Sequence, residues 1–361
     1  MILQMEPWFG AEEARAVNEY LKSGGWVTEF RKTREFEQAI EEFTGAKHCI
    51  VTNNGTISLS LGAMACGVQS GNDVLVPNYT MVATPNSVKM FGANPIFVDV
   101  DPLTLCMRLD LAEQALTKKT TAVMLVTPNG RYPREGIDSW IAFATRHNLA
   151  LIEDAAQSLG SHYPTGVHIG TVGHVGSFSF SAPKVISTGQ GGAIVTNDDT
   201  IAERVRRLKD FGRSSGGTDV HDTIGYNFKF TDVQAVIGLA QMQKLSWRVD
   251  RKKQILERYQ TKLSGVTPIE FFEQDLDHTT PWFIDIRTQE RDNLADFLRD
   301  RGIGTRPMYP PINAQKAYSC PGSYPASEEI GRNGLWLPSA SQLSDEQIDT
   351  VCSALTEFYR F

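Results

Sequence analysis

One lysine stands in a run of small, apolar and hydroxyl side chains, GSFSFSAPKVISTGQGGAIVTND, at residues 176–198. A lysine ammonium is strongly hydrated and is seldom buried without a partner or a task. This segment holds no carboxylate before Asp198. Lys184 is therefore a candidate for a desolvated, nucleophilic amine that forms a Schiff base. Ser179, five residues earlier, offers a hydroxyl to a phosphate, and the glycines after Lys184 let the backbone pass close to a ligand.

Asp154 follows an apolar run in LALIEDA, residues 149–155. A carboxylate buried at a strand end is costly unless it meets a cation or a strong hydrogen-bond donor. A protonated heteroaromatic nitrogen is one such partner, because the carboxylate would keep that nitrogen charged. The alternative is an ordinary aspartate that caps the backbone at the end of a strand.

The segment TNNGTIS, residues 52–58, follows a strand-like run and opens a helical pattern. Gly55 allows close backbone approach, and the N–H groups at a helix start form an anion site. Asn54, Gly55 and Thr56 are therefore candidates to hold a phosphate. The alternative is a plain strand-to-helix turn with Thr56 as the N-cap.

A fourth segment, GYNFKFTDVQAVIGLAQ at residues 225–241, has a polar turn that ends in Thr231 and Asp232. These two residues are suited to cap the helix that follows. Asn227 lies in this turn and is either a site residue or a turn residue that bonds its own backbone. A Schiff-base lysine, an aspartate 30 residues upstream and a phosphate-binding turn are together the parts needed to hold pyridoxal phosphate.

The elements that must position these residues alternate along the chain. Short apolar runs predict strands at 48–53, 73–78, 95–101, 121–128, 149–155 and 176–181. Helical patterns lie before and between them at 10–22, 33–44, 56–67, 81–91, 110–117 and 136–147. Such alternation predicts an α/β fold with a mostly parallel sheet that is buried on both faces. Ligands bind such sheets at the carboxyl ends of the strands, where Asp154 lies.

The chain length of 361 residues favours one large domain and one smaller one. We predict a large cofactor-binding domain over residues 1–245, which includes the N-terminal segment, and a smaller C-terminal α/β domain over 246–361. A long helical pattern from 232 to about 263 is expected to span the join.

Composition excludes several classes of protein. The net charge of −7 argues against a nucleic-acid-binding surface, which needs clustered Lys and Arg. The N-terminus has no basic region before an apolar one, and no run reaches the ~20 apolar residues of a membrane span. The five cysteines are scattered and form no C-x-x-C pair. We therefore expect a cytoplasmic protein without a metal site and without contact with a membrane.

Several motifs in the same order make the chain resemble the DegT/StrS-type sugar aminotransferases. The motifs include SGGWVTEF, NNGT, VPNYTMVATPNSV, IEDAAQSLG, FSFSAPKVISTGQGGAIVTND, YNFKFTDVQAVIGLAQ and GIGTRPMYPPI. The resemblance covers nearly the whole chain. It implies a pyridoxal-phosphate enzyme with the aspartate aminotransferase fold (fold type I), in which a large domain with a mostly parallel sheet precedes a smaller one.

The resemblance also implies a role for each candidate. Lys184 would bind the cofactor as a Schiff base and carry protons, Asp154 would pair with the pyridine nitrogen, and Gln157 would lie by the phenolic oxygen. The phosphate would be held by Asn54, Gly55, Thr56 and Ser179. Asn227 would reach in from a partner subunit, so that the functional unit is a homodimer with shared active sites.

Three positions depart from the family pattern. Met81 stands where many relatives place an aromatic residue that stacks on the cofactor, although a thioether also packs on a π-face. Gln190 and Lys229 replace a frequent Glu and a frequent Arg. One branch of the family has histidine at the lysine position and acts as a dehydratase, so Lys184 indicates transamination.

The segment VTPNGRYP, residues 126–133, bears on the identity of the amino-group acceptor. Many relatives have a histidine-containing segment there, whereas this chain has Asn129 and Arg131, which could grip a carboxylate or phosphate. The segment resembles that of the branch that makes 8-amino-3,8-dideoxy-manno-octulosonate from an acid sugar without a nucleotide. The alternative is a surface arginine in a turn. Arg306 in GTRPMY has the same two interpretations.

The reaction implied is a ping-pong transfer. Glutamate would give its amino group, leaving pyridoxamine phosphate and 2-oxoglutarate, and a keto- or aldehydo-sugar would then take the amino group. The acceptor would be a nucleotide-linked deoxysugar or 8-oxo-3,8-dideoxy-octulosonate in the synthesis of surface polysaccharide or lipopolysaccharide. Two alternatives remain open, namely a pyridoxal-phosphate sugar dehydratase and a non-enzymatic sensor on the same fold.

Overall fold

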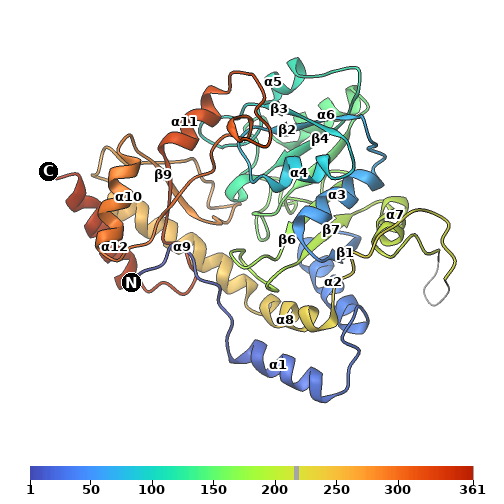
Figure 1. The fold of residues 1–361 in the computed structure, drawn as a ribbon. Coiled ribbons are helices and arrows are strands. Elements are labelled where there is room, and N and C mark those ends of the chain that lie inside the picture. Colours follow the sequence, from blue (N-terminus) through green and yellow to red (C-terminus); the bar gives the residue numbers. More distant parts are fainter. Residues whose placement is uncertain (215–218, 361) are drawn as a thin grey trace.

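The computed structural model describes residues 1–214 and 219–360, and a seven-stranded sheet lies at its centre (Figure 1). The strand order is β1-β7-β6-β5-β4-β2-β3. The strands are β1 (His48–Thr52), β2 (Asp73–Pro77), β3 (Asn94–Val98), β4 (Thr120–Val126), β5 (Ala150–Asp154), β6 (Val175–Ser179) and β7 (Gly192–Thr196). Within this sheet β7 pairs antiparallel with both β1 and β6, and the remaining pairs are parallel. The predicted mostly parallel sheet is confirmed.

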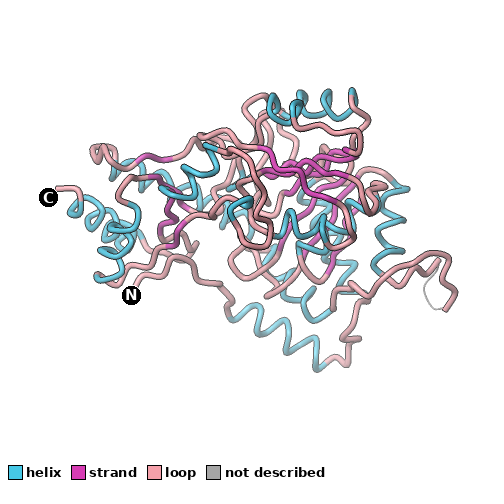
Figure 2. The backbone as a smooth tube through the Cα atoms, turned by 45° about the horizontal axis from the view of Figure 1, so that its top comes forward, coloured by secondary structure: helices cyan, strands magenta, loops and turns pink. Residues whose placement is uncertain are grey.

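Both faces of this sheet are buried, as the continuous apolar runs predict. Side chains alternate between two hydrophobic clusters along each strand. On β5, Leu151 belongs to one cluster and Ile152 to the other, and on β4 Leu125 and Met124 divide in the same way. Helices lie on both sides of the strands (Figure 2). The site residues that follow the strands are therefore attached to a well-packed frame.

The first six helices around the large sheet lie close to their predicted ranges, and the seventh had no prediction. They are α1 (Ala11–Lys22), α2 (Arg31–Thr44), α3 (Gly55–Ala65), α4 (Ala83–Lys89), α5 (Leu109–Gln114), α6 (Ile137–Arg146) and α7 (Asp199–Lys209). A short 3-10 turn, η1 (Pro128–Gly130), follows β4. Among the described residues no helix has both the length and the apolar character needed to cross a membrane.

A second, antiparallel sheet lies in the C-terminal region, in the strand order β10-β11-β9-β8. Its strands are β8 (Glu270–Phe271), β9 (Ile284–Arg287), β10 (Arg306–Pro307) and β11 (Gly334–Leu337). The helices of this region are α10 (Arg291–Asp300), α11 (Pro325–Asn333) and α12 (Asp345–Phe358), and a 3-10 turn, η2, covers Ile312–Ala314. A separate hydrophobic cluster fills it.

The single helix predicted from 232 to about 263 is wrong. The structure has two helices there, α8 (Asp232–Met242) and α9 (Leu245–Leu263), which meet end to end (Figure 1). At the junction Lys244 is drawn into ion pairs with Glu12 and Glu13 of α1. Apolar spacing continues across the junction, so the pattern alone cannot reveal this break. Thr231 caps α8 through its side chain, as expected.

The first residues of the chain lie with the C-terminal region, although the prediction grouped them with the large domain. The N–H of Ile2 donates to the Gly302 carbonyl at 2.8 Å, and Gly304 donates back to the Ile2 carbonyl at 2.7 Å. These contacts join segments about 300 residues apart, which no local pattern reveals. The domain boundary near residue 245 stays a prediction.

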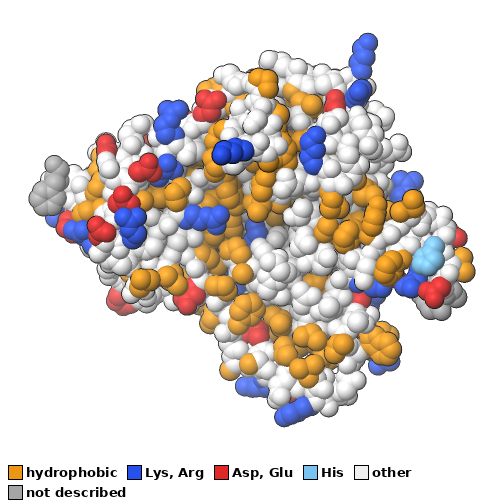
Figure 3. All heavy atoms as spheres, in the orientation of Figure 1, with side chains coloured by type: hydrophobic (Ala, Val, Ile, Leu, Met, Phe, Trp, Pro, Cys, Tyr) orange, Lys and Arg blue, Asp and Glu red, His pale blue; other side chains and the backbone are white. Residues whose placement is uncertain are grey.

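The outer surface is mixed in character. On the face shown in Figure 3, Lys and Arg side chains are scattered among hydrophobic and acidic ones and do not gather into one basic area.

Candidate active site

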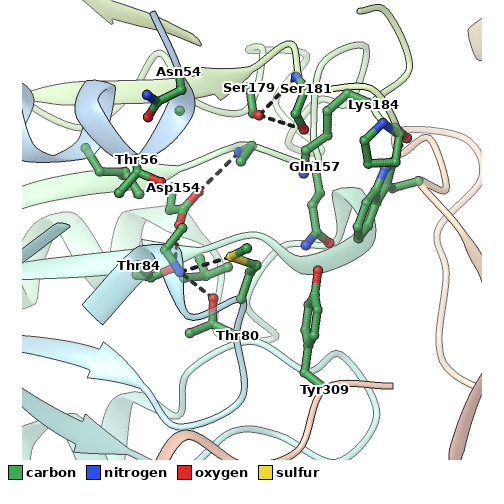
Figure 4. A pocket seen from close by; sticks show the side chains of 18 of the residues that line it. Asn54, Thr56, Thr80, Thr84, Asp154, Gln157, Ser179, Ser181, Lys184 and Tyr309 are labelled. Carbon is green, nitrogen blue, oxygen red and sulfur yellow. Dashed lines mark hydrogen bonds between the residues drawn. The ribbon is translucent and has the colours of Figure 1, made fainter. Parts of the chain in front are cut away.

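A cavity of about 570 Å³ opens at the carboxyl ends of the strands, between the two sheets. This volume lies in the usual range for small-molecule sites. Nine of the twelve predicted site residues line the cavity: Asn54, Gly55, Thr56, Met81, Asp154, Gln157, Ser179, Lys184 and Arg306. Figure 4 shows the side chains of Asp154, Gln157, Ser179 and Lys184 around this space. Asn129, Arg131 and Asn227 do not line it.

Lys184 lies in the turn after β6, and its N–H donates to the Ser181 carbonyl at 3.0 Å. Its Nζ lies 4.2 Å from the centre of the Trp282 ring. Burial lowers the pKa of Lys184 to about 8, and the nearby Asp154 carboxylate opposes this change. At neutral pH this amine is therefore neutral far more often than an ordinary lysine, as a nucleophile requires.

Asp154 ends β5 and is 5% exposed. Its carboxylate accepts hydrogen bonds from Thr84 Oγ1 at 2.7 Å and from the Ala156 N–H at 3.3 Å. Burial raises the pKa of Asp154, and these donors and Lys184 oppose the rise. Within the described residues no Lys, Arg or His lies in salt-bridge distance of it. A buried carboxylate of this kind favours a cationic ligand.

The turn before α3 forms the third wall. Asn54 is the N-cap of α3, since its Oδ1 accepts from the Ile57 N–H at 3.0 Å. The alternative with Thr56 as the N-cap is therefore wrong. A Cβ on Gly55 would lie 3.0 Å from Ser179 Cβ, so a larger residue would crowd the serine and require it to shift. The first N–H groups of α3 thus lie close to a serine hydroxyl, an arrangement suited to a phosphate.

Gln157 and Met81 complete the cofactor candidates. Gln157 Oε1 accepts from the Asn129 N–H at 2.7 Å, which fixes the orientation of the amide and leaves its NH2 end as the donor. Met81 is 45% exposed at the edge of the cavity. Its thioether is therefore accessible to a ligand, although stacking by Met81 stays a prediction.

Arg131 and Asn129 do not line the cavity and are held by contacts within the protein, which speaks against the predicted role in substrate binding. Arg131 is 3% exposed and forms two hydrogen bonds with Asp285, at 2.7 and 2.8 Å. The side chain of Asn129 bonds the backbone of Phe283, accepting from its N–H at 2.6 Å and donating to its carbonyl at 2.8 Å. The segment does lie at the carboxyl end of β4. The carboxylate that its arginine grips belongs to the protein, 154 residues away in the chain.

Arg306 and Asn227 have different surroundings. Arg306 is exposed, lines the cavity, and lies 5.4 Å from the Trp336 ring centre. Within the described residues its guanidinium forms no salt bridge, so it is available to an anion. Asn227 is exposed and pairs with Asp210 through a backbone bridge. Its role in the site of a partner subunit stays a prediction.

Thr84, Trp282 and Tyr309 are among the cavity residues that carry no role in the sequence-based prediction. Thr84 belongs to a family motif, but its bond to Asp154 joins residues 70 apart. Trp282 and Tyr309 come from the second sheet region. A sequence signal existed for Thr84 and Tyr309, which lie in motifs of the resemblance, but not for Trp282.

Comparison with known proteins decides the family. A model of the DegT/DnrJ/EryC1/StrS aminotransferase family matches residues 7–356. The chain belongs to this family. It is a transaminase, as the sequence predicts, and the dehydratase and sensor alternatives are set aside.

Two relatives match the chain over nearly its whole length. The GDP-perosamine synthase of Escherichia coli O157:H7 is 35% identical over 358 residues, which cover 98% of this chain and 97% of that protein. The GDP-perosamine synthase of Vibrio cholerae is 32% identical over 368 residues and covers 99% of each.

Solved structures agree in fold. TlmJ, an aminotransferase from Streptoalloteichus hindustanus, superposes with a TM-score of 0.92 at 32% identity, covering 98% of each chain. DesV from S. venezuelae, in complex with a ketimine intermediate, gives a TM-score of 0.91 at 30% identity, covering 97% of this chain and 95% of its own. The predicted aspartate aminotransferase-like fold is confirmed.

This family implies pyridoxal phosphate, and the site fits that group. Asp154 is a buried carboxylate with no salt-bridge partner in the described part of the chain, as a pyridinium nitrogen requires. Lys184 is a desolvated amine in the same cavity. The close approach of Gly55 to Ser179 leaves the start of α3 open to an anion.

The Arg131–Asp285 pair gives a first test. Asp285→Ala leaves the Arg131 guanidinium buried without a counter-charge, so we expect the free energy of unfolding to fall by about 3–5 kcal/mol. Urea denaturation followed by circular dichroism measures this. Asp296→Ala removes an exposed pair with Arg299 and is the control, with a loss below about 1 kcal/mol. Equal losses in the two variants would show that the buried pair has no special weight.

Proposed function

We propose that this chain transfers an amino group from glutamate to a keto-sugar that is linked to a nucleotide, using pyridoxal phosphate. The observation that carries the proposal is that Lys184 and Asp154 line the same cavity. Neither has a salt-bridge partner among the described residues. The relatives over the whole chain are GDP-perosamine synthases, whose name specifies a GDP-linked sugar. The amino donor is carried over from the sequence resemblance.

Four groups would hold the cofactor. The Asp154 carboxylate would face its ring nitrogen, and the start of α3 with Ser179 would bind its phosphate. Gln157, whose carbonyl end is fixed by the Asn129 N–H, would offer its NH2 end to an oxygen. When bound, pyridoxal phosphate supplies the electron sink that makes amino transfer possible.

Lys184 would carry the protons. With a pKa of about 8 the amine is cationic below that pH and neutral above it. As a neutral amine Nζ accepts a proton from the substrate carbon, and as an ammonium it returns one. A group that works in both directions is most effective when its pKa lies near the working pH, which is the condition that burial creates here.

Arg306 favours a nucleotide-linked acceptor. The acid-sugar proposal rested on Arg131, whose two terminal nitrogens are bonded to Asp285. Arg306 is the exposed cation on the wall of the cavity, on the C-terminal sheet. A guanidinium forms paired hydrogen bonds with phosphate oxygens, so we assign Arg306 to the phosphates of the acceptor.

A homodimer would complete the site. Large apolar side chains are exposed on the α1–α2 connection, at Trp26 and Phe30, and in the segment 219–228, at Ile224 and Tyr226. Exposed apolar residues of this size are typical of protein interfaces. We propose that a second copy covers them and contributes Asn227.

The five cysteines are free, as expected for a cytoplasmic enzyme of surface-sugar synthesis.

Lys184→Ala should abolish transfer. Loss of the nucleophile and proton carrier is expected to lower kcat by at least about a thousandfold. The measurement is stoichiometric release of 2-oxoglutarate from glutamate together with formation of the amino sugar. Lys118→Ala, at an exposed site, is the control and should keep wild-type kcat. Turnover that survives in Lys184→Ala would remove the basis of the proposal.

Arg306→Ala tests the acceptor. Loss of charged hydrogen bonds to phosphate should raise KM for a GDP-linked keto-sugar about 10- to 100-fold. Arg306→Lys should fall between this variant and the wild type, because a point charge remains. Arg301→Ala removes a surface pair with Glu357 and is the control. An unchanged KM in Arg306→Ala, or faster turnover of 8-oxo-3,8-dideoxy-octulosonate by the wild type, would contradict the nucleotide assignment.

A further inference from the structure

The indole of Trp282, which lies in the loop before β9 of the C-terminal sheet, covers the amine of Lys184. Trp282 lies two residues before β9 and is 2% exposed. Its ring centre lies 4.2 Å from Lys184 Nζ, so the amine faces the π-surface at contact distance. The same ring therefore occupies space from which water would otherwise reach the amine.

Trp282 also holds the backbone next to Lys184. Its Nε1–H donates to the carbonyl of Pro183 at 2.8 Å. Indole nitrogen is a donor only, and this bond uses it. One side chain thus contacts both ends of the lysine, the peptide bond at its start and the amine at its tip.

The segment that carries Trp282 is fixed at three points. Lys252 is 1% exposed, and its Nζ donates to the Trp282 carbonyl at 2.7 Å and to the Ser339 carbonyl. Asn129 bonds both backbone groups of Phe283, and Arg131 grips Asp285. The Phe283 ring stacks on the indole with centroids 3.8 Å apart. These anchors leave the indole little freedom.

We propose that Trp282 is a positioning residue for Lys184. Its indole shields the amine from water and fixes the turn that presents the amine to the cavity. This role rests on the proposed function only in that Lys184 is the reactive amine. The anchors Asn129 and Arg131, at the end of β4, act through Trp282 rather than on the substrate.

Other charged and titratable groups around the cavity do not replace this effect. They are Asp154 on β5, Arg306 on β10 and Tyr309 just after it. Asp154 raises the pKa of Lys184, whereas burial lowers it and is the larger cause. Removing the ring loses a cation–π contact, which favoured the charged amine, and also loses the burial. Because the indole covers the amine at contact distance, we expect the gain of hydration to outweigh the lost cation–π contact, so that loss of the ring raises the pKa.

The test measures the amine itself in protein freed of cofactor. Cyanate modifies neutral amines, and mass spectrometry quantifies carbamylation at Lys184 across a pH series. The wild-type midpoint is expected at about pH 8. Trp282→Ala should move the midpoint up by about one pH unit. Trp282→Phe keeps an apolar ring over the amine and should stay near the wild type.

Trp247→Phe is the control for loss of an indole, because Trp247 is half exposed on α9 and packs on Trp8. Its midpoint should equal that of the wild type. Midpoints are compared rather than rates, since removal of the ring also opens access to the reagent. An unchanged midpoint in folded Trp282→Ala, or an equal shift in Trp247→Phe, would overturn the proposal.

A second readout covers the case in which Trp282→Ala does not fold. Trp282→Phe loses the bond to Pro183, so kcat should fall about tenfold while KM for both substrates stays unchanged. Wild-type kcat in this variant would overturn the positioning role. The carbamylation measurement involves no substrate, so its result holds even if the wild type aminates no sugar. Absence of sugar amination would contradict the proposed function but not the role of Trp282.

Discussion

The site depends on two opposite charges that are buried in one cavity without being paired. Asp154 influences the pKa of Lys184, and Lys184 that of Asp154, yet the two groups form no salt bridge. A direct pair would fix the lysine as a cation and leave the carboxylate with nothing to offer a ligand. Their separation keeps the amine titratable near neutral pH and the carboxylate ready for a positive nitrogen.

Other buried charges of the described chain are satisfied by partners within the protein. Lys209 is paired with Glu29 at 3.0 Å, and Arg131 with Asp285 at 2.7 Å. Lys252 has no carboxylate but donates to two carbonyls. Leaving a charge buried without such partners costs stability, so it persists where a ligand or a reaction requires it. The groups that are satisfied within the protein hold the frame, whereas Lys184 and Asp154 face the cavity.

Much of this arrangement could be predicted from the sequence because it is local. The first six strands produce continuous apolar runs, and Asp154 follows one of them directly. Lys184 stands out since its neighbours offer it no carboxylate. The turn at Gly55 carries its own signal, as a glycine at a helix start. In each case the residues that decide the structure lie within a few positions of one another.

The remaining features could not be predicted because they join distant segments. Arg131 has the residue type and position of a substrate-binding group, and only the folded chain places Asp285 against it. The break before α9 coincides with ion pairs between Lys244 and α1. Trp282, just before β9, contacts Lys184, which lies in the turn after β6. Such contacts depend on tertiary packing and leave no periodic trace in the sequence.

The central claim is that Lys184 is the amine to which pyridoxal phosphate is attached. Purified protein saturated with pyridoxal phosphate is reduced with borohydride, digested, and mapped by mass spectrometry. We expect one peptide that carries a phosphopyridoxyl group, with the added mass on Lys184. Modification of another lysine in its place, or none at all, would contradict it.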